Sequence, residues 1–173
     1  MSHWTVTNLQ TPGGLSVLPL QRDQIAMVYP LIQILKPDIS LERWLAYARS
    51  LVHVRETGTT GAKVAVNHAG HIFGMFTWRQ EDDLNHGRRL SVENFIAMEV
   101  VGLPIIGAAM VAEMKRQAAK QRCATVRAAL PSRAAADKLG AMSTATLYCD
   151  AGPVIEREQV VSLMVGKPAP SAT

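Results

Sequence analysis

Aromatic residues, cysteine and long apolar runs are all scarce in this chain of 173 residues. Aromatics make up only 5%, and no Lys/Arg run with interleaved aromatics occurs, which argues against a nucleic-acid partner. The only two cysteines, Cys123 and Cys149, share no metal-type spacing with the five histidines, so we expect buried free thiols and no metal site. No apolar run approaches the length of a membrane span and no leader pattern opens the sequence, so we expect a cytoplasmic protein without membrane partners.

What is present indicates one folded domain. Hydrophobic residues make up 48% of the chain and charged residues 18%, which is ordinary for a globular protein. The formal net charge of +4 and the sequence pI near 9.3 suit a small anionic ligand at least as well as nucleic acid. We expect a flexible arm over residues 1–14, a single domain over 15–165 and a flexible tail over 166–173.

Hydrophobic periodicity predicts strands and helices that alternate along the chain. The expected strands are residues 15–20, 63–66, 72–78, 90–100, 123–130, 144–149 and 160–165. The expected helices are 22–35 with a kink at Pro30, 40–53, a long one ending near Arg122, and 131–139. The polar segment 79–89 is interpreted as a charged loop. The resulting order is β-α-α-β-β-β-α-β-α-β-β, without an internal repeat.

The stretch from residue 90 to 130 is predicted to form a strand, a turn at Gly102, a helix with Pro104 in its first turn, and a second, parallel strand. The first N–H groups of such a helix could bind a phosphate over residues 103–108. A plain β-α-β packing unit without a ligand is the commoner alternative.

The helix of this stretch has two kinds of surface. Met110, Val111, Met114 and Ala118 form an apolar side, and the charged residues are expected to face solvent: Glu113, Lys115, Arg116 and Lys120. Nucleic-acid binding through these cations together with Arg88, Arg89 and Arg122 is an alternative that no motif supports.

The order of elements and three local segments resemble the GNAT superfamily of acyl-CoA-dependent N-acetyltransferases. FIAMEVVGLPIIG is similar to its fourth strand and pyrophosphate loop, AAMVAEMKRQAAKQRCATVRAAL to its main helix and fifth strand, and ADKLGAM to its short Lys-Leu-Gly helix. The resemblance implies an α+β (mixed α/β) fold with a mostly antiparallel, twisted sheet of about six or seven strands and helices on both faces.

The same resemblance implies transfer of an acetyl group from acetyl-CoA, or another acyl-CoA, directly to the amine of a small molecule or protein. By position, Glu93 would be the base and Tyr148 a weak candidate for the acid. The coenzyme would contact Met98, Glu99, Val100, Val101, Leu103, Ile105, Ile106, Gly107 and Ala108, and the acceptor would contact Tyr29, Trp44 and Tyr47. A homodimer is left open.

The sequence also departs from the family pattern. Of its loop, Gly102, Leu103, Pro104, Ile105, Ile106 and Gly107, only the last glycine matches, and Ala136 stands where a tyrosine acid is usual. Glu93 could equally be a paired structural carboxylate. The acidic residues Glu81, Asp82 and Asp83 either attract a cationic acceptor or, as we prefer, form a solvated loop. A binding or regulatory module that keeps the fold without the chemistry is therefore the alternative function.

Overall fold

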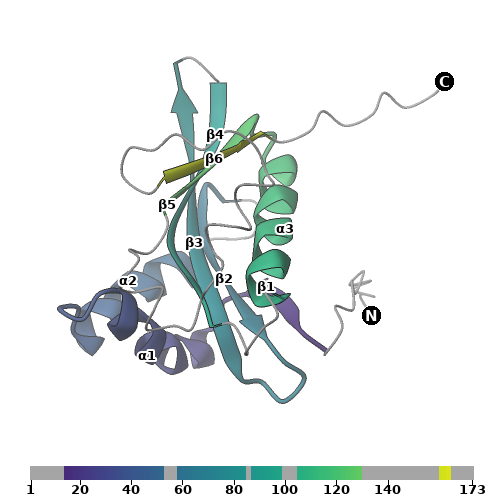
Figure 1. The fold of residues 1–173 in the computed structure, drawn as a ribbon. Coiled ribbons are helices and arrows are strands. Elements are labelled where there is room, and N and C mark those ends of the chain that lie inside the picture. The colour runs from purple at the N-terminus through teal and green to yellow at the C-terminus, as the bar shows by residue number, and fades with distance from the viewer. Residues whose placement is uncertain (1–13, 53–57, 85–86, 99–104, 130–159, 165–173) are drawn as a thin grey trace, which may run out of the picture.

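Six strands form one sheet in the computed structural model, which describes residues 14–52, 58–84, 87–98, 105–129 and 160–164 (Figure 1). The elements, with their bounds, are β1 Ser16–Pro19, the 3-10 turn η1 Arg22–Gln24, α1 Ile25–Leu35, α2 Leu41–Val52, β2 Thr60–Val66, β3 Ile72–Asp83, β4 Gly87–Ala97, α3 Ile105–Lys120, β5 Thr125–Ala129 and β6 Val160–Met164. The predicted helix 131–139 and strand 144–149 lie outside the described residues. The mixed α+β class and the order of the described elements are confirmed.

The strands are arranged in the sheet in the order β1-β2-β3-β4-β5-β6. All neighbours are antiparallel except β4 and β5, which are parallel. A parallel pair needs a crossover connection, and the segment between these two strands contains α3. The predicted β-α-β unit is therefore present.

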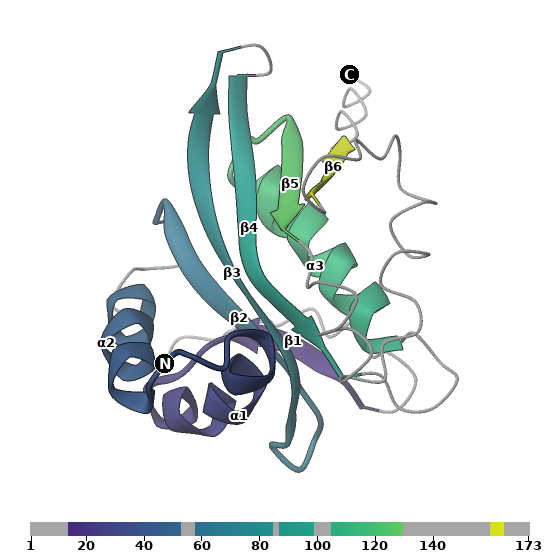
Figure 2. The ribbon, with the colours of Figure 1, turned by 60° about the vertical axis from the view of Figure 1, so that its left-hand side comes forward.

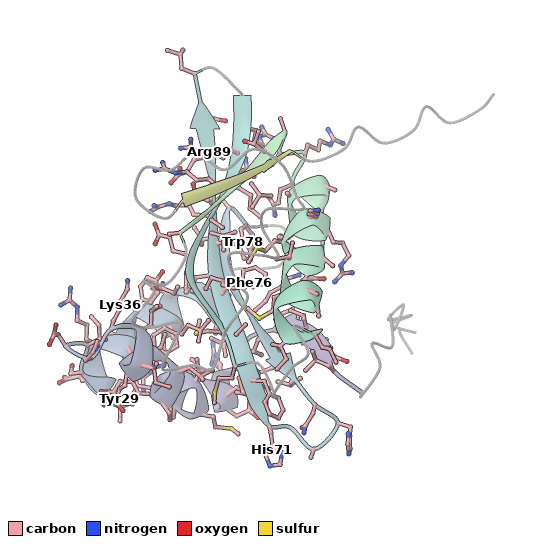
Figure 3. The ribbon with its side chains drawn as sticks, viewed as in Figure 1. Tyr29, Lys36, His71, Phe76, Trp78 and Arg89 are labelled. Atoms are coloured by element: carbon pink, nitrogen blue, oxygen red, sulfur yellow. The ribbon has the colours of Figure 1, made fainter. Side chains whose placement is uncertain are left out.

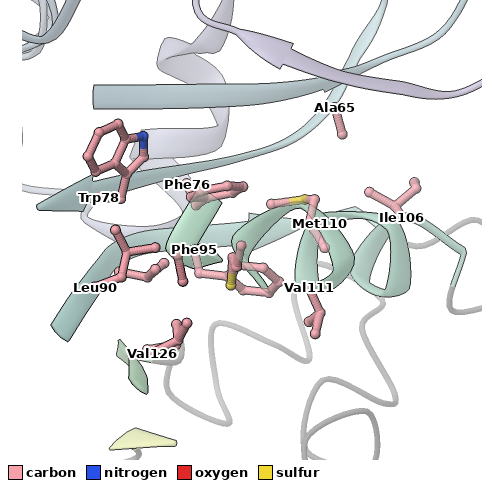
Figure 4. Close-up of a cluster of buried hydrophobic side chains, with 14 of the residues drawn as sticks. Ala65, Phe76, Trp78, Leu90, Phe95, Ile106, Met110, Val111 and Val126 are labelled. Atoms are coloured by element: carbon pink, nitrogen blue, oxygen red, sulfur yellow. The ribbon is translucent and has the colours of Figure 1, made fainter. Parts of the chain in front are cut away.

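Helices cover both faces of the sheet: α1 and α2 pack on one face and α3 on the other (Figure 2). Side chains of β3 alternate between the faces, as in any strand. Phe76 and Trp78 belong to the cluster beneath α3, whereas Met75 belongs to the cluster beneath α1 and α2. Figure 4 shows Phe76 and Phe95 between the sheet and the helical residue Met110. Because both faces are covered, β2 is buried along almost its whole length.

Gly74 allows α3 to lie close to the sheet. A Cβ at this position would be 2.6 Å from the sulfur of Met110 and 2.7 Å from the carbonyl oxygen of Ile96. Neither distance is tolerated by a real methyl group. The missing side chain thus sets the distance between the first half of α3 and the strands β3 and β4.

In the segment predicted as a charged loop, residues 79–83 instead belong to β3 and residues 87–89 to β4, and these ends of the two paired strands extend beyond the helices in Figure 2. Their pairing continues through Glu81 opposite Arg89 to Asp83 opposite Gly87. The prediction failed because this part of the hairpin is polar on its surface, so it lacks the apolar alternation of a half-buried strand. Cross-strand charge pairs hold it together instead.

Glu113 was expected on the solvent face of the helix, but this prediction is wrong, because the residue is only 7% exposed. Its carboxylate pairs with the ammonium group of Lys63 on β2, which is equally buried, and accepts a hydrogen bond from Arg116 Nε at 2.7 Å. Lys115, Arg116 and Lys120 are exposed as expected. Helical spacing alone could not reveal that a lysine of the sheet faces Glu113.

The remaining differences are small. The predicted helix 22–35 is divided into η1 and α1, and α1 continues through Pro30. Cys123 is buried, as predicted, and burial raises the pKa of its thiol. Cys149 lies outside the described residues, as do nearly all of the arm and the tail. None of the helices in the described ranges combines the length and apolar character that crossing a membrane requires.

Candidate active site

A β-bulge in β4 forms one wall of the site. Thr77 of β3 pairs with Glu93 and Met75 pairs with Ile96, so Phe76 between them faces two residues of β4 instead of one. Asn94, one of these two, has a φ of 51°, in the left-handed region where asparagine is better tolerated than most residues.

The bulge reverses the alternation of β4. Before it, Leu90 and Val92 belong to the cluster beneath α3; after it, Phe95 and Ala97 do. The two residues in between, Glu93 and Asn94, consequently both face the α1–α2 side and line the same cavity. An uninterrupted strand would have pointed one of them to the other face.

The side chain of Thr77 fixes the shape of this bulge. Its hydroxyl donates to the carbonyl oxygen of Glu93 at 3.1 Å and accepts from the amide Nδ2 of Asn94 at 3.0 Å. Thr77 is 2% exposed, and both hydrogen bonds are partly buried. The direction of Glu93 and Asn94 is thereby set from β3.

The cavity beside the bulge has a volume of about 220 Å³. Residues of α1, the α1–α2 connection, α2 and β4 line it: Ile32, Lys36, Ile39, Arg43, Trp44, Tyr47, Glu93 and Asn94. Trp44 is 2% exposed and its indole Nε1 donates to the carbonyl oxygen of Ile25 at 2.7 Å, which holds the ring in place. The ring of Tyr47 lies 6.1 Å from it, tilted by 49°.

Glu93 brings a carboxylate to this cavity. Its side chain is 52% exposed, and its Oε1 lies 3.4 Å from Nη2 of Arg79, which also contacts Glu81 at 3.0 Å. A contact of 3.4 Å is long for a charge-assisted hydrogen bond. The carboxylate is therefore accessible from the cavity and only loosely held by Arg79.

Glu81 is in a different setting, and neither it nor Asp82 is among the described residues that line the cavity. Oε2 of Glu81 accepts from the Ser91 hydroxyl at 2.6 Å and from Arg89 at 3.0 Å. These hydrogen bonds, with a smaller contribution from Arg79, hold the pKa of Glu81 below its usual value. Glu81 is thus part of a network of hydrogen bonds across paired strands, and the interpretation of Glu81, Asp82 and Asp83 as a solvated loop is corrected. The side chain of Asp83 lies outside the described residues.

Strands β4 and β5 pair over a short distance only. Their register runs from Arg89 opposite Thr125 to Val92 opposite Ala128, while β4 itself continues to Ala97. The described pairing therefore ends immediately before the bulge. The described part of β5 ends one residue later, at Ala129.

The coenzyme-binding residues predicted from the sequence are only partly described. Met98 follows β4 and its N–H donates to the carbonyl oxygen of Phe73 at 2.7 Å. Four others form the first turn of α3: Ile105, Ile106, Gly107 and Ala108. Four predicted coenzyme contacts and the candidate acid lie outside the described residues: Glu99, Val100, Val101, Leu103 and, as the acid, Tyr148. The rest of the loop, Gly102 and Pro104, and Ala136 lie there too.

On the acceptor side, the structure brings together three of the four predicted residues, Trp44, Tyr47 and Glu93. The fourth, Tyr29, is not among the described cavity residues, and its hydroxyl donates to the carbonyl oxygen of Ile39 at 2.9 Å. Figure 3 shows Tyr29 and Lys36 on the helical side, far from Arg89 on the hairpin.

Sequence reasoning missed Lys36, Arg43 and Asn94. Lys36 lies directly after the end of the predicted helix 22–35, a position that carries no functional signal by itself. A signal for the bulge was present, since the apolar residues shift from Leu90 and Val92 to Phe95 and Ala97.

No protein-family model matches the sequence, and no curated protein matches it. Several solved protein structures, however, are similar to the structure of this chain. Spermidine N-acetyltransferase from Vibrio cholerae, in complex with CoA and spermine, is similar with a TM-score of 0.59 at 12% identity, over 88% of this chain and 96% of that one. Glucosamine-6-phosphate N-acetyltransferase from Arabidopsis thaliana gives 0.56 at 12% identity, over 83% and 95%.

The chain has the GNAT fold. The fold that the resemblance implied is thus confirmed, over most of the chain. A transcriptional regulator from Bacillus halodurans C-125 is also similar, with a TM-score of 0.60 at 13% identity, over 83% of this chain and 95% of that one. Since proteins of different function share the GNAT fold, function has to be argued from the site.

Proposed function

We propose that the protein is an acyl-CoA-dependent N-acetyltransferase that transfers an acetyl group directly to an amine. The observation that carries this proposal is the position of Glu93. Its carboxylate lines a cavity on a bulge of β4, one residue beyond the point where the described β4–β5 pairing ends. A proton acceptor and a space for an acceptor molecule therefore occur at one place, next to the end of the described β4–β5 pairing.

The proposal places a CoA thioester along the end of β4 and the start of α3. The strand β4 continues past its pairing with β5, and α3 then begins close to the sheet because Gly74 lacks a side chain. The proposal assigns the pantetheine arm to β4 near Met98 and the pyrophosphate to the first turn of α3, where helix N–H groups favour an anion. Acetyl-CoA supplies the acetyl group as an activated thioester.

The chemistry requires protons to move as well as the acetyl group. The new amide N–C bond forms as the C–S bond of the thioester breaks, so an acceptor ammonium loses two protons and the departing thiolate gains one. Glu93 takes the first proton, directly or through a water, which exposes the nitrogen lone pair. Tyr148 is proposed as the acid for the thiolate on sequence position alone.

Two measurements test the proposal. Acetyl-CoA at millimolar concentration should raise the melting temperature, because a ligand that binds only the native state stabilises it. In the presence of a panel of primary amines, acetyl-CoA should be converted to free thiol with stoichiometric N-acetylation. Absence of both stabilisation and thiol release would refute the enzyme and leave the fold as a binding module.

Glu93→Gln tests the role of the base. Turnover should fall by roughly 100-fold or more, the usual contribution of general base catalysis, while acetyl-CoA affinity stays unchanged. Glu42→Gln is the matched control, because Glu42 is exposed on α2 and does not line the cavity. Equal turnover in the two variants would remove Glu93 from the mechanism.

A further inference from the structure

The acceptor cavity has an uneven distribution of charge. Two cationic side chains line it, Lys36 and Arg43, against one carboxylate, Glu93. We propose that the acceptor amine also carries an anionic group, a carboxylate or a phosphate, which Lys36 and Arg43 bind while the amine faces Glu93. This inference rests on the proposed function and adds the chemical class of the acceptor.

The charged groups come from different walls. Lys36 follows the last residue of α1 and Arg43 belongs to the first turn of α2, whereas Glu93 belongs to the sheet. The helical wall thus offers cations and the sheet wall offers a proton acceptor. A molecule with an amine at one end and an anion at the other matches this arrangement in both sign and position.

The two cations are available for such a ligand. The side chains of Lys36 and Arg43 form no ion pair or hydrogen bond with any residue that the structure describes; the hydrogen bond of Arg43 to the Ser40 hydroxyl comes from its backbone N–H. The acidic residues next to them in sequence, Asp38 and Glu42, do not line the cavity. The described ion pair of Glu93 is with Arg79, and not with Lys36 or Arg43.

The apolar lining of the cavity strengthens the attraction of Lys36 and Arg43 for an anion. Ile32, Ile39 and the rings of Trp44 and Tyr47 form much of the lining, and apolar walls of a concave site focus an electric field. At about 220 Å³ the cavity is smaller than the roughly 300–1,000 Å³ that encloses a drug-sized ligand, so the part of the acceptor that enters it is small. A long polycation would bring positive charge against Lys36 and Arg43, and we expect it to be a poor acceptor.

The test offers each amine with and without its anionic group. Glucosamine 6-phosphate is compared with glucosamine, methionine with methioninamide, and spermidine serves as the polycation. Binding to the full chain is measured by calorimetry, and acetyl transfer by thiol release from acetyl-CoA. We expect at least one anionic member to bind and react about tenfold or more better than its counterpart, which is a typical effect of a charge-assisted hydrogen bond.

Lys36→Gln and Arg43→Gln should each lower this preference several-fold, and the double variant should abolish it. Arg49→Gln is the matched control: it removes the same charge from an exposed position of α2 that does not line the cavity, and should keep the full preference. All three positions are exposed, so the variants should fold normally, which their melting temperatures will show.

Failure of the proposed acceptor class can be distinguished from failure of the proposed acetyltransferase function. All these variants should still be stabilised by acetyl-CoA, since Lys36 and Arg43 lie on the acceptor side. If acetyl-CoA binds and amines are acetylated without an anion preference, or with a preference for spermidine, the acceptor class is wrong and the enzyme remains. If no acetylation occurs, the calorimetric preference still decides, and its absence overturns the inference.

Discussion

Asn94 is the residue at which backbone geometry and site geometry meet. With a φ of 51° it places its own side chain and that of Glu93 on the same face of the sheet. A residue with a Cβ and no compensating hydrogen bond costs about 1–2 kcal/mol in this conformation, whereas glycine adopts it freely. The bulge therefore depends on the residue type at this one position.

We expect Asn94→Gly to be more stable than Asn94→Ala by about 1 kcal/mol, because both lose the amide contact to Thr77 and only alanine keeps the unfavourable φ. Urea unfolding midpoints measure the difference. The neighbouring Glu93, which has no positive φ, is the control. At this position Glu93→Gly should be less stable than Glu93→Ala. The same order at both positions would contradict the strained backbone.

At the scale of single residues, the sequence predicted some of the residues that line the cavity, but not all of them. The position of Glu93 on a central strand and of Trp44 and Tyr47 on a flanking helix followed from periodicity and the resemblance, and the structure brings the three together. Asn94 could not be assigned in this way, because a bulge depends on backbone dihedrals and pairing across strands. Lys36 and Arg43 appear as ordinary exposed cations until the tertiary fold places them around one cavity.

At the scale of elements, one buried ion pair connects the sheet to α3. Glu113 has two cationic partners, Lys63 and Arg116, whereas Glu113 is the only ion-pair partner of Lys63 among the described residues. Breaking a buried pair leaves a charge without compensation and costs about 3–5 kcal/mol. The cost should depend on which charge remains.

Glu113→Leu should destabilise the protein by about 3–5 kcal/mol, since it leaves the ammonium group of Lys63 buried and unpaired. Lys63→Met should cost less, because Glu113 keeps Arg116, which is largely exposed and can follow it. The double variant should be more stable than Glu113→Leu alone. Denaturant unfolding of the three variants tests this order, and equal losses in the two single variants would refute it.

The β3–β4 hairpin shows why some elements are misread from sequence. Its outer half contains charged residues of both signs, a composition typical of loops. Only the register, with Glu81 opposite Arg89, shows that the charges pair across strands. The apolar inner half was predicted as strand because most of its side chains face a core.

The hairpin network predicts a pH dependence. The native-state pKa of Glu81 lies below its value in the unfolded chain, so its contribution to stability is complete above the unfolded pKa and is lost as the pH falls through the native one. Glu81→Gln should therefore lower the urea midpoint at pH 7 and have a diminishing effect towards pH 2. Glu42→Gln, which changes an exposed carboxylate outside this network, should show no such trend.

At the scale of the whole molecule, one sheet separates two hydrophobic clusters. Trp44 reports on the cluster beneath α1 and α2, and Trp78 on the cluster beneath α3. The resemblance to the GNAT superfamily implied this two-faced arrangement, with helices on both faces of the sheet. What it could not predict is the shape of the cavity, which depends on the bulge and on side chains far apart in sequence.

Because both clusters share the same strands, we expect them to unfold as one cooperative unit. Variants with Trp4→Phe and either Trp44→Phe or Trp78→Phe leave a single reporting tryptophan on one face. Ile25→Val, a change confined to the α1–α2 cluster, should cost about 1 kcal/mol. It should shift the fluorescence midpoint of each reporter, relative to its own parent, by the same free energy. A shift seen by Trp44 alone would show that the two faces unfold separately, and acceptor and coenzyme sites would then rest on independent units.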